Sequence, residues 1–112
     1  PLFARVAVNR IWAELTGRGI VEPVDDFRVS NPPANPELLD HLAESFVRSG
    51  YDVKALVRAV CNSETYQRSS VVLPGNARDD RFFARAYPRR LPAETLLDTL
   101  GQITLKPERF WP

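Results

Sequence analysis

The segment from residue 2 to residue 16, LFARVAVNRIWAELT, constrains the fold most strongly, because apolar side chains surround most of its helical wheel. A narrow polar strip interrupts them, formed by Arg5, Asn9, Arg10 and Glu14. A helix that is apolar on nearly every side has to be covered by other elements. The sequence therefore predicts a central, largely buried helix that ends at Gly17 and Gly19, since glycine tolerates the left-handed conformation of helix ends.

Two more helices are predicted directly from cap residues. Asn35 is a favourable N-cap for a helix over about 36–49, proline is tolerated in the first turn, and Gly50 stops the helix. Asp52 is the expected cap of a third helix, whose core face runs from Val53 to Cys61. Gly50 is therefore expected in a tight corner between two helices.

The sequence pattern of the carboxyl-terminal third predicts two further helices. One is expected over 78–86, ended by Pro88, and another from Pro92 to about Thr104. The apolar residues expected to face inward on the last helix are Leu96, Leu97, Leu100 and Ile103. We therefore expect an all-α fold, a compact bundle of about five helices that forms a single domain over 1–112.

Residues 20–35, IVEPVDDFRVSNPPAN, show neither helical nor strand periodicity. Pro23, Pro32 and Pro33 prevent regular hydrogen bonding there. Structureless connections of this length are uncommon in compact domains unless they are functional or packed by their own side chains. We expect a long irregular loop held on the core through Val21, Val24, Phe27 and Val29.

Composition narrows the class of protein. The 112 residues include 44% hydrophobic residues and carry a net charge of +1, which suits one globular domain and gives no general electrostatic footprint for nucleic acid or an anionic membrane. No apolar run is long enough for a transmembrane segment. The chain contains no methionine and begins at Pro1, so we expect a piece of a larger multidomain protein. The single cysteine, Cys61, excludes an internal disulfide.

No catalytic constellation is visible in the sequence. His41 is the only histidine, and with Glu37, Asp40 and Glu44 it fits a solvated helix face better than a metal site. Cys61 lies on an apolar face and is expected to be a small buried hydrophobe rather than a nucleophile. The pairs Asp25-Asp26 and Asp79-Asp80 are each expected to serve in a loop or a helix cap, the alternative being acid–base chemistry or cation binding. We therefore predict no cofactor or metal for this stretch and lean against an enzyme.

The richest polar cluster is RFFARAYPRR at 81–90, which interleaves four arginines with aromatic residues. Single-stranded nucleic acid or an acidic glycan binds through such ion pairing and stacking. The low net charge argues against nucleic acid. The favoured interpretation places Phe82 and Phe83 in the core, with the arginines paired to loop carboxylates such as Asp25 and Asp26.

Several long phrases carry a resemblance to a known family. They are VNRIWAEL at 8–15, GRGIVEPVDDFR at 17–28, NPPANPELLDHLA at 31–43, GYDVKALVRAVCNSETYQRSS at 50–70 and FARAYPRRLPAETLLD at 83–98. Together they resemble the planctomycete-enriched domain of unknown function numbered fifteen fifty-three. The resemblance implies an exported, envelope-associated protein with other domains on the same polypeptide, among them a cytochrome-c-like segment that would bind haem. It implies no established activity.

The leading hypothesis is a structural or interaction module whose partners are other domains of the same polypeptide. An Arg–carboxylate network is expected to fix the loop at 20–35, so that loss of one charged partner lowers stability. The alternatives are binding or processing of an acidic polysaccharide and, second, nucleic-acid binding. The candidate structural or ligand cluster comprises Arg10, Arg18, Asp25, Asp26, Arg28, Tyr66, Arg85, Arg89 and Arg90.

Overall fold

The computed structural model describes residues 2–106, and helices are the only regular secondary structure in this range. The helices are α1 (Leu2–Thr16), α2 (Pro36–Arg48), α3 (Val53–Cys61) and α4 (Ala93–Thr104). The predicted all-α class is confirmed, with four helices described rather than about five.

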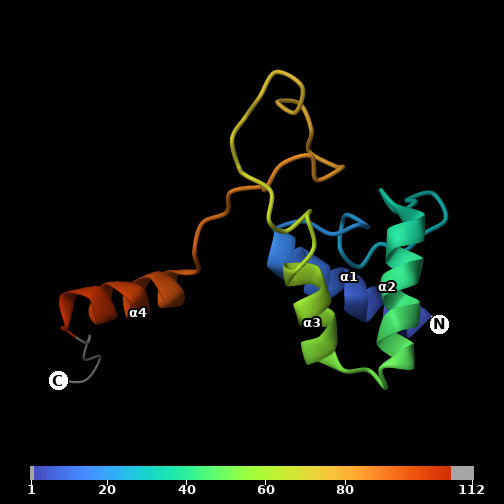
Figure 1. The fold of residues 1–112 in the computed structure, drawn as a ribbon, viewed down its shortest axis with the longest axis horizontal. Helices are drawn as coiled ribbons and strands as arrows, with labels where there is room; N and C mark the ends of the chain where they lie inside the picture. Colours follow the sequence, from blue (N-terminus) through green and yellow to red (C-terminus); the bar gives the residue numbers. More distant parts are fainter. Residues whose placement is uncertain (1, 107–112) are drawn as a thin grey trace.

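Helix α1 packs against both α2 and α3, and these three helices form the body of the molecule (Figure 1). Its buried residues include Ala4, Val8 and Trp12, so the predicted central position of α1 is confirmed. Helices α2 and α3 are amphipathic, as expected of helices with one face covered by neighbouring elements. The buried residues of these two helices are Leu39, Leu42, Ala43, Phe46, Leu56 and Val60.

The predicted caps of α2 and α3 are present. The Asn35 side chain accepts a hydrogen bond of 3.0 Å from the Leu38 N–H, and the Asp52 carboxylate accepts one of 3.1 Å from the Ala55 N–H. Each satisfies an N–H that has no partner within its helix. Gly50 has a φ of +70° in the corner between the two helices, a conformation that glycine adopts without steric cost.

The loop at 20–35 lies on the body, as expected, although not every predicted anchor contributes. Ile20 and Val21 are buried, while Val24 and Phe27 are half-buried. Val29 is fully exposed, so its expected packing was wrong. The anchoring side chains lie near the start of the loop, where the chain returns along α1.

The helix predicted over 78–86 does not form. The backbone N–H groups of Arg81, Phe82 and Ala84 donate to the Asp79 carboxylate instead of to helical carbonyls. Phe83 has a φ of +56°, which is incompatible with a right-handed helix. The competing side-chain acceptor thus replaces the helix with a series of turns, a known effect of aspartate near a chain reversal.

Helix α4 stands apart from the body at the end of an extended segment (Figure 1). It makes no contact with α1, α2 or α3, and none of its residues is buried. The radius of gyration is 17.1 Å, against about 13 Å for a closed chain of this length. Leu96, Leu100 and Ile103, which were expected to face inward, are therefore exposed. Within residues 2–106, the helices lack the length and apolar character needed to cross a membrane.

Candidate functional site

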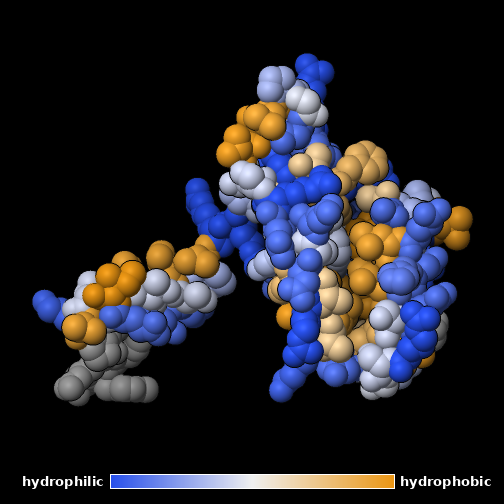
Figure 2. All heavy atoms as spheres, in the orientation of Figure 1, coloured by the Kyte–Doolittle hydropathy of each residue, from blue (hydrophilic) through white to orange (hydrophobic). Residues whose placement is uncertain are grey.

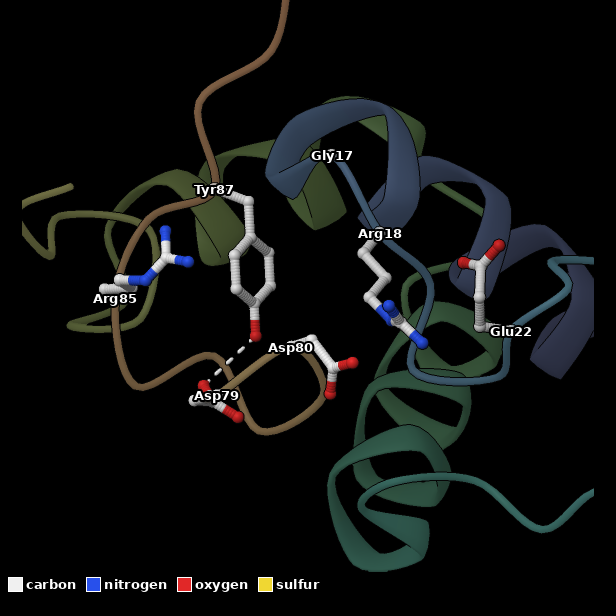
Figure 3. Close-up of a pocket in the computed structure, with 7 residues that line it drawn as sticks. All are labelled: Gly17, Arg18, Glu22, Asp79, Asp80, Arg85 and Tyr87. Atoms are coloured by element: carbon white, nitrogen blue, oxygen red, sulfur yellow. Dashed lines mark hydrogen bonds between the residues drawn. The ribbon is translucent and has the colours of Figure 1, made fainter. Parts of the chain in front are cut away.

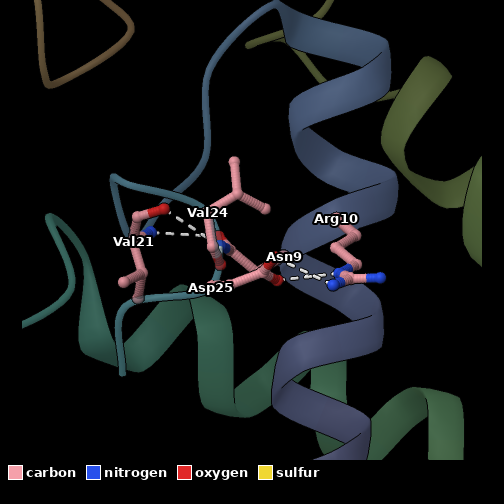
Figure 4. A network of polar contacts seen from close by, with 5 residues as sticks. All are labelled: Asn9, Arg10, Val21, Val24 and Asp25. Atoms are coloured by element: carbon pink, nitrogen blue, oxygen red, sulfur yellow. Dashed lines mark hydrogen bonds and ion pairs between the residues drawn. The ribbon is translucent and has the colours of Figure 1, made fainter. Parts of the chain in front are cut away.

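The side chain of Asn9 holds the loop at 20–35 onto α1 (Figure 4). Its Nδ2 donates to the carbonyls of Val21 at 3.0 Å and Val24 at 2.8 Å, and its Oδ1 accepts from the Val21 N–H at 2.9 Å. Asn9 is completely buried, so these bonds satisfy backbone groups that water does not reach. Gly19 passes so close that a Cβ there would collide with the Val21 carbonyl. The sequence placed Asn9 only on a polar strip, and the one signal was that Asn9 is the only amide side chain among the charged residues of that strip.

Two arginine–carboxylate pairs lie on the outside of the same loop. Arg10 donates through Nε and Nη2 to the two carboxylate oxygens of Asp25, both at 2.8 Å, and Arg28 makes the same double contact with Asp26 at 2.6 Å. These hydrogen bonds lower the pKa of each carboxyl group. The Arg10–Asp25 pair is exposed, with 62% of each side chain accessible, so water screens it. The large loss of stability expected from breaking a buried pair therefore does not apply to it.

The 81–90 segment reaches the core through one of its two phenylalanines. Phe83 is buried and packs edge-to-face on Trp12, with ring centroids 5.4 Å apart. Phe82 is 69% exposed, so its expected burial was wrong. Phe83 also contacts the Tyr87 ring at 5.6 Å. The segment is thus joined to α1 by a small aromatic cluster of Trp12, Phe83 and Tyr87.

The arginines of this segment do not pair with the loop carboxylates as expected, because Arg10 and Arg28 already bind both oxygens of Asp25 and Asp26. Arg85 lies over the Tyr87 ring, with its Cζ 5.4 Å from the centroid, and its buried Nε has no partner within residues 2–106. Arg89 donates to the backbone carbonyl of Glu14. Arg90 is exposed and makes no hydrogen bond or ion pair with other residues in this range.

A hollow of about 280 Å³ opens where the start of the loop meets the 79–87 segment (Figure 3). Two of the nine predicted cluster residues, Arg18 and Arg85, line it, whereas Tyr66 lies elsewhere and is 42% exposed. The prediction missed the acidic lining, because Asp79 and Asp80 were interpreted as a helix cap. The lining residues are Gly17, Arg18, Glu22, Asp79, Asp80, Arg85 and Tyr87.

Comparison with protein families identifies the chain. A family model described as PSD1, protein of unknown function (DUF1553), matches residues 1–109. The chain belongs to the DUF1553 family. No curated protein and no solved structure gave a match. The family assignment agrees with the resemblance carried by the sequence phrases, and it brings no activity with it.

The histidine, cysteine and acidic side chains of residues 2–106 in this DUF1553 chain are dispersed. Within the described part, no three histidine, cysteine or acidic side chains gather in a way that could hold a metal ion. His41 is exposed on α2. Cys61 is half-buried on α3 rather than fully buried. The carboxylate pair at 25–26 is occupied by two different arginines, as described above.

Asp79 organises the 79–87 segment of the DUF1553 chain. Its carboxylate accepts from the N–H groups of Arg81, Phe82 and Ala84 at 2.6–3.1 Å and from the Tyr87 hydroxyl at 3.1 Å. Desolvation alone would raise the pKa of Asp79, but these four donors outweigh it and lower the pKa from 3.8 to about 2. Burial raises the pKa of Tyr87, which keeps its hydroxyl protonated as a donor.

This lowered pKa predicts a specific loss of stability in acid. A carboxyl group with a depressed folded-state pKa contributes stability above its unfolded value, near 3.8, and loses it as the pH falls toward about 2. We expect Asp79→Asn to lower the melting temperature at pH 7, and the difference from the unsubstituted chain to shrink steadily between pH 4 and pH 2. Thermal unfolding followed by circular dichroism at pH 7 and between pH 4 and pH 2 measures this difference in melting temperature. Asp98→Asn on α4 is the control, because the Asp98 carboxylate makes no ion pair within residues 2–106. A pH-independent effect of Asp79→Asn would contradict the assignment.

Proposed function

We propose that this DUF1553 domain is an interaction module of a larger exported protein, in which α4 packs against another domain of the same polypeptide. The observation that carries the proposal is the uncovered apolar face of α4. Leu96, Leu100 and Ile103 lie on one side of the helix and are 46%, 49% and 74% exposed. Figure 2 shows apolar side chains gathered along one edge of the projecting helix. Apolar faces of this kind mark interaction sites, since their burial is favourable.

The charge distribution of α4 supports docking of one face only. The acidic residues Glu94 and Asp98 lie opposite the apolar face at helical spacing, so the helix is amphipathic with no partner on its apolar side among residues 2–106. In the same proposal the three-helix body is the base, and the Arg10–Asp25 pair supplements Asn9 in holding the loop at 20–35, while the Arg28–Asp26 pair lies within the loop itself. The exported setting rests on the family resemblance.

The docking of α4 is testable by hydrogen exchange. We expect amides of residues 93–104 to exchange more slowly in the full-length polypeptide than in the 112-residue chain, because packing suppresses local opening. Leu100→Asp should abolish the additional protection, whereas Gln102→Asp, which adds the same charge on the polar face, should preserve it. Equal exchange of 93–104 in both proteins, or equal effects of the two substitutions, would exclude the proposal.

A further inference from the structure

The hollow between the start of the loop and the 79–87 segment holds opposite charges that do not neutralise each other. Arg18 and Asp80 extend toward one another across it (Figure 3). Within residues 2–106, neither the Arg18 guanidinium nor the Asp80 carboxylate makes a hydrogen bond or an ion pair. Asp79, by contrast, has its oxygens occupied by four donors. Two strong polar groups thus converge on a hollow with their bonding capacity unused.

The formal charge of the lining disfavours an anionic ligand on electrostatic grounds. Arg18 and Arg85 supply two positive charges, and Glu22, Asp79 and Asp80 supply three negative charges, so the lining has a formal charge of −1. An acidic glycan, one of the ligands expected from the arginine-rich sequence, would meet this negative excess. Because positive and negative side chains both line the hollow, a neutral ligand that can bond to each kind suits it better than an anion.

The hydrogen-bonding capacity of the lining further narrows the chemical class of the ligand. A guanidinium is only a donor and an ionised carboxylate is only an acceptor. A hydroxyl group both donates and accepts, so a ligand with neighbouring hydroxyls satisfies Arg18 and Asp80 together. We propose that this hollow is a binding site for a neutral sugar, with Arg18 and Asp80 bonding to adjacent hydroxyls of one ring.

The volume of the hollow suits a ligand the size of one sugar ring. Its volume of about 280 Å³ is at the lower end of the range for ligand pockets, which suits a single ring and not an extended chain. Tyr87 forms one wall, and Gly17 lies beside it, since a Cβ on Gly17 would be 3.7 Å from the Tyr87 carbonyl oxygen (Figure 3). This site lies far from the apolar face of α4, and the proposal is independent of α4 docking.

The test is an NMR titration of the 112-residue chain with neutral sugars. D-glucose, D-galactose, D-xylose and cellobiose are the probes, with D-galacturonate and glycine as the charged and zwitterionic comparisons. We expect at least one neutral sugar to cause saturable shifts of the amides around residues 17–22 and 79–87. Arg18→Ala and Asp80→Ala should each weaken that binding by about tenfold, the effect of losing one charge-assisted hydrogen bond.

Matched variants keep the result interpretable. Arg90→Ala removes an arginine that lies outside the hollow and should leave the affinity unchanged. Arg18→Ala and Asp80→Ala should keep the melting temperature of the unsubstituted chain, because neither side chain makes a hydrogen bond within residues 2–106. The proposal is overturned if no neutral sugar shifts these amides, if galacturonate or glycine binds more tightly than every neutral sugar, or if Arg90→Ala weakens binding as much as Arg18→Ala.

Discussion

Asn9→Leu is expected to destabilise the fold by about 3 kcal/mol or more. The substitution leaves the Val21 N–H and the carbonyls of Val21 and Val24 without the partners that bind them now, and each unsatisfied buried group costs about 1–3 kcal/mol. Leucine has a similar size, so the loss is assigned to hydrogen bonding rather than to a cavity. Urea unfolding at pH 7 measures the free energy directly. Because small domains are stable by only about 5–15 kcal/mol, this is a large share of the total.

The neighbouring residue provides the control for this prediction. Arg10→Ala breaks the exposed ion pair with Asp25 on the same turn of α1 and should change stability little. Asn9→Asp keeps the acceptor for the Val21 N–H but loses both donors, so its deficit should lessen in acid, where a protonated carboxyl donates one bond. If Arg10→Ala destabilised the chain as much as Asn9→Leu, the ion pair would hold the loop as strongly as the amide does, contrary to this prediction.

Trp12→Ala is expected to cost about 3–5 kcal/mol, the usual effect of removing a large aromatic side chain from a core. Trp12 is 2% exposed and joins α1 to the 79–87 segment through its edge-to-face contact with Phe83. Phe83→Ala should have an effect of similar size. A double-mutant cycle between the two positions should give a coupling energy of about 0.5–1.5 kcal/mol, the strength of an aromatic pair beyond burial alone.

Phe82 offers a matched comparison because it is the same residue type one position away. It is 69% exposed, so Phe82→Ala should change stability by no more than about 0.5 kcal/mol. Equal effects of Phe82→Ala and Phe83→Ala in urea unfolding would show that the segment does not enter the core through Phe83. A coupling energy of zero between Trp12 and Phe83 would contradict the contact itself.

The candidate site was only partly predictable. Arg10 and Asp25 were both placed in the candidate cluster, but the arginines expected to pair with Asp25 were those of the 81–90 segment, and Arg10 binds it instead. Their exposure was not predictable, since it depends on which face of α1 the loop covers. The buried partner, Asn9, lies one residue earlier, and the sequence offers no local feature that ranks an amide above an arginine as the residue holding the loop.

The residues that line the hollow were also hard to predict, because they are far apart in the sequence. Arg18 and Arg85 were both expected in a ligand cluster, yet they were expected beside Arg10 and Tyr66, which lie elsewhere. Asp80 enters the hollow only because the 79–87 segment turns around Asp79 instead of forming a helix. An aspartate followed by four possible donors fits either a helix cap or a turn, and the packing of Phe83 on Trp12 accompanies the second outcome.

The sequence by itself determined the all-α class, the bounds of α1 and the caps of α2 and α3, because these depend on periodicity and on contacts within four residues. The tertiary structure alone decided that Asn9 binds the loop, that Phe83 and not Phe82 is buried, and that no other helix within residues 2–106 covers the apolar face of α4. A local pattern states that a side chain is apolar or can form hydrogen bonds. Which surface such a side chain packs against depends on the path of the whole chain. The competing arrangements differ in only a few contacts, so their free energies are close.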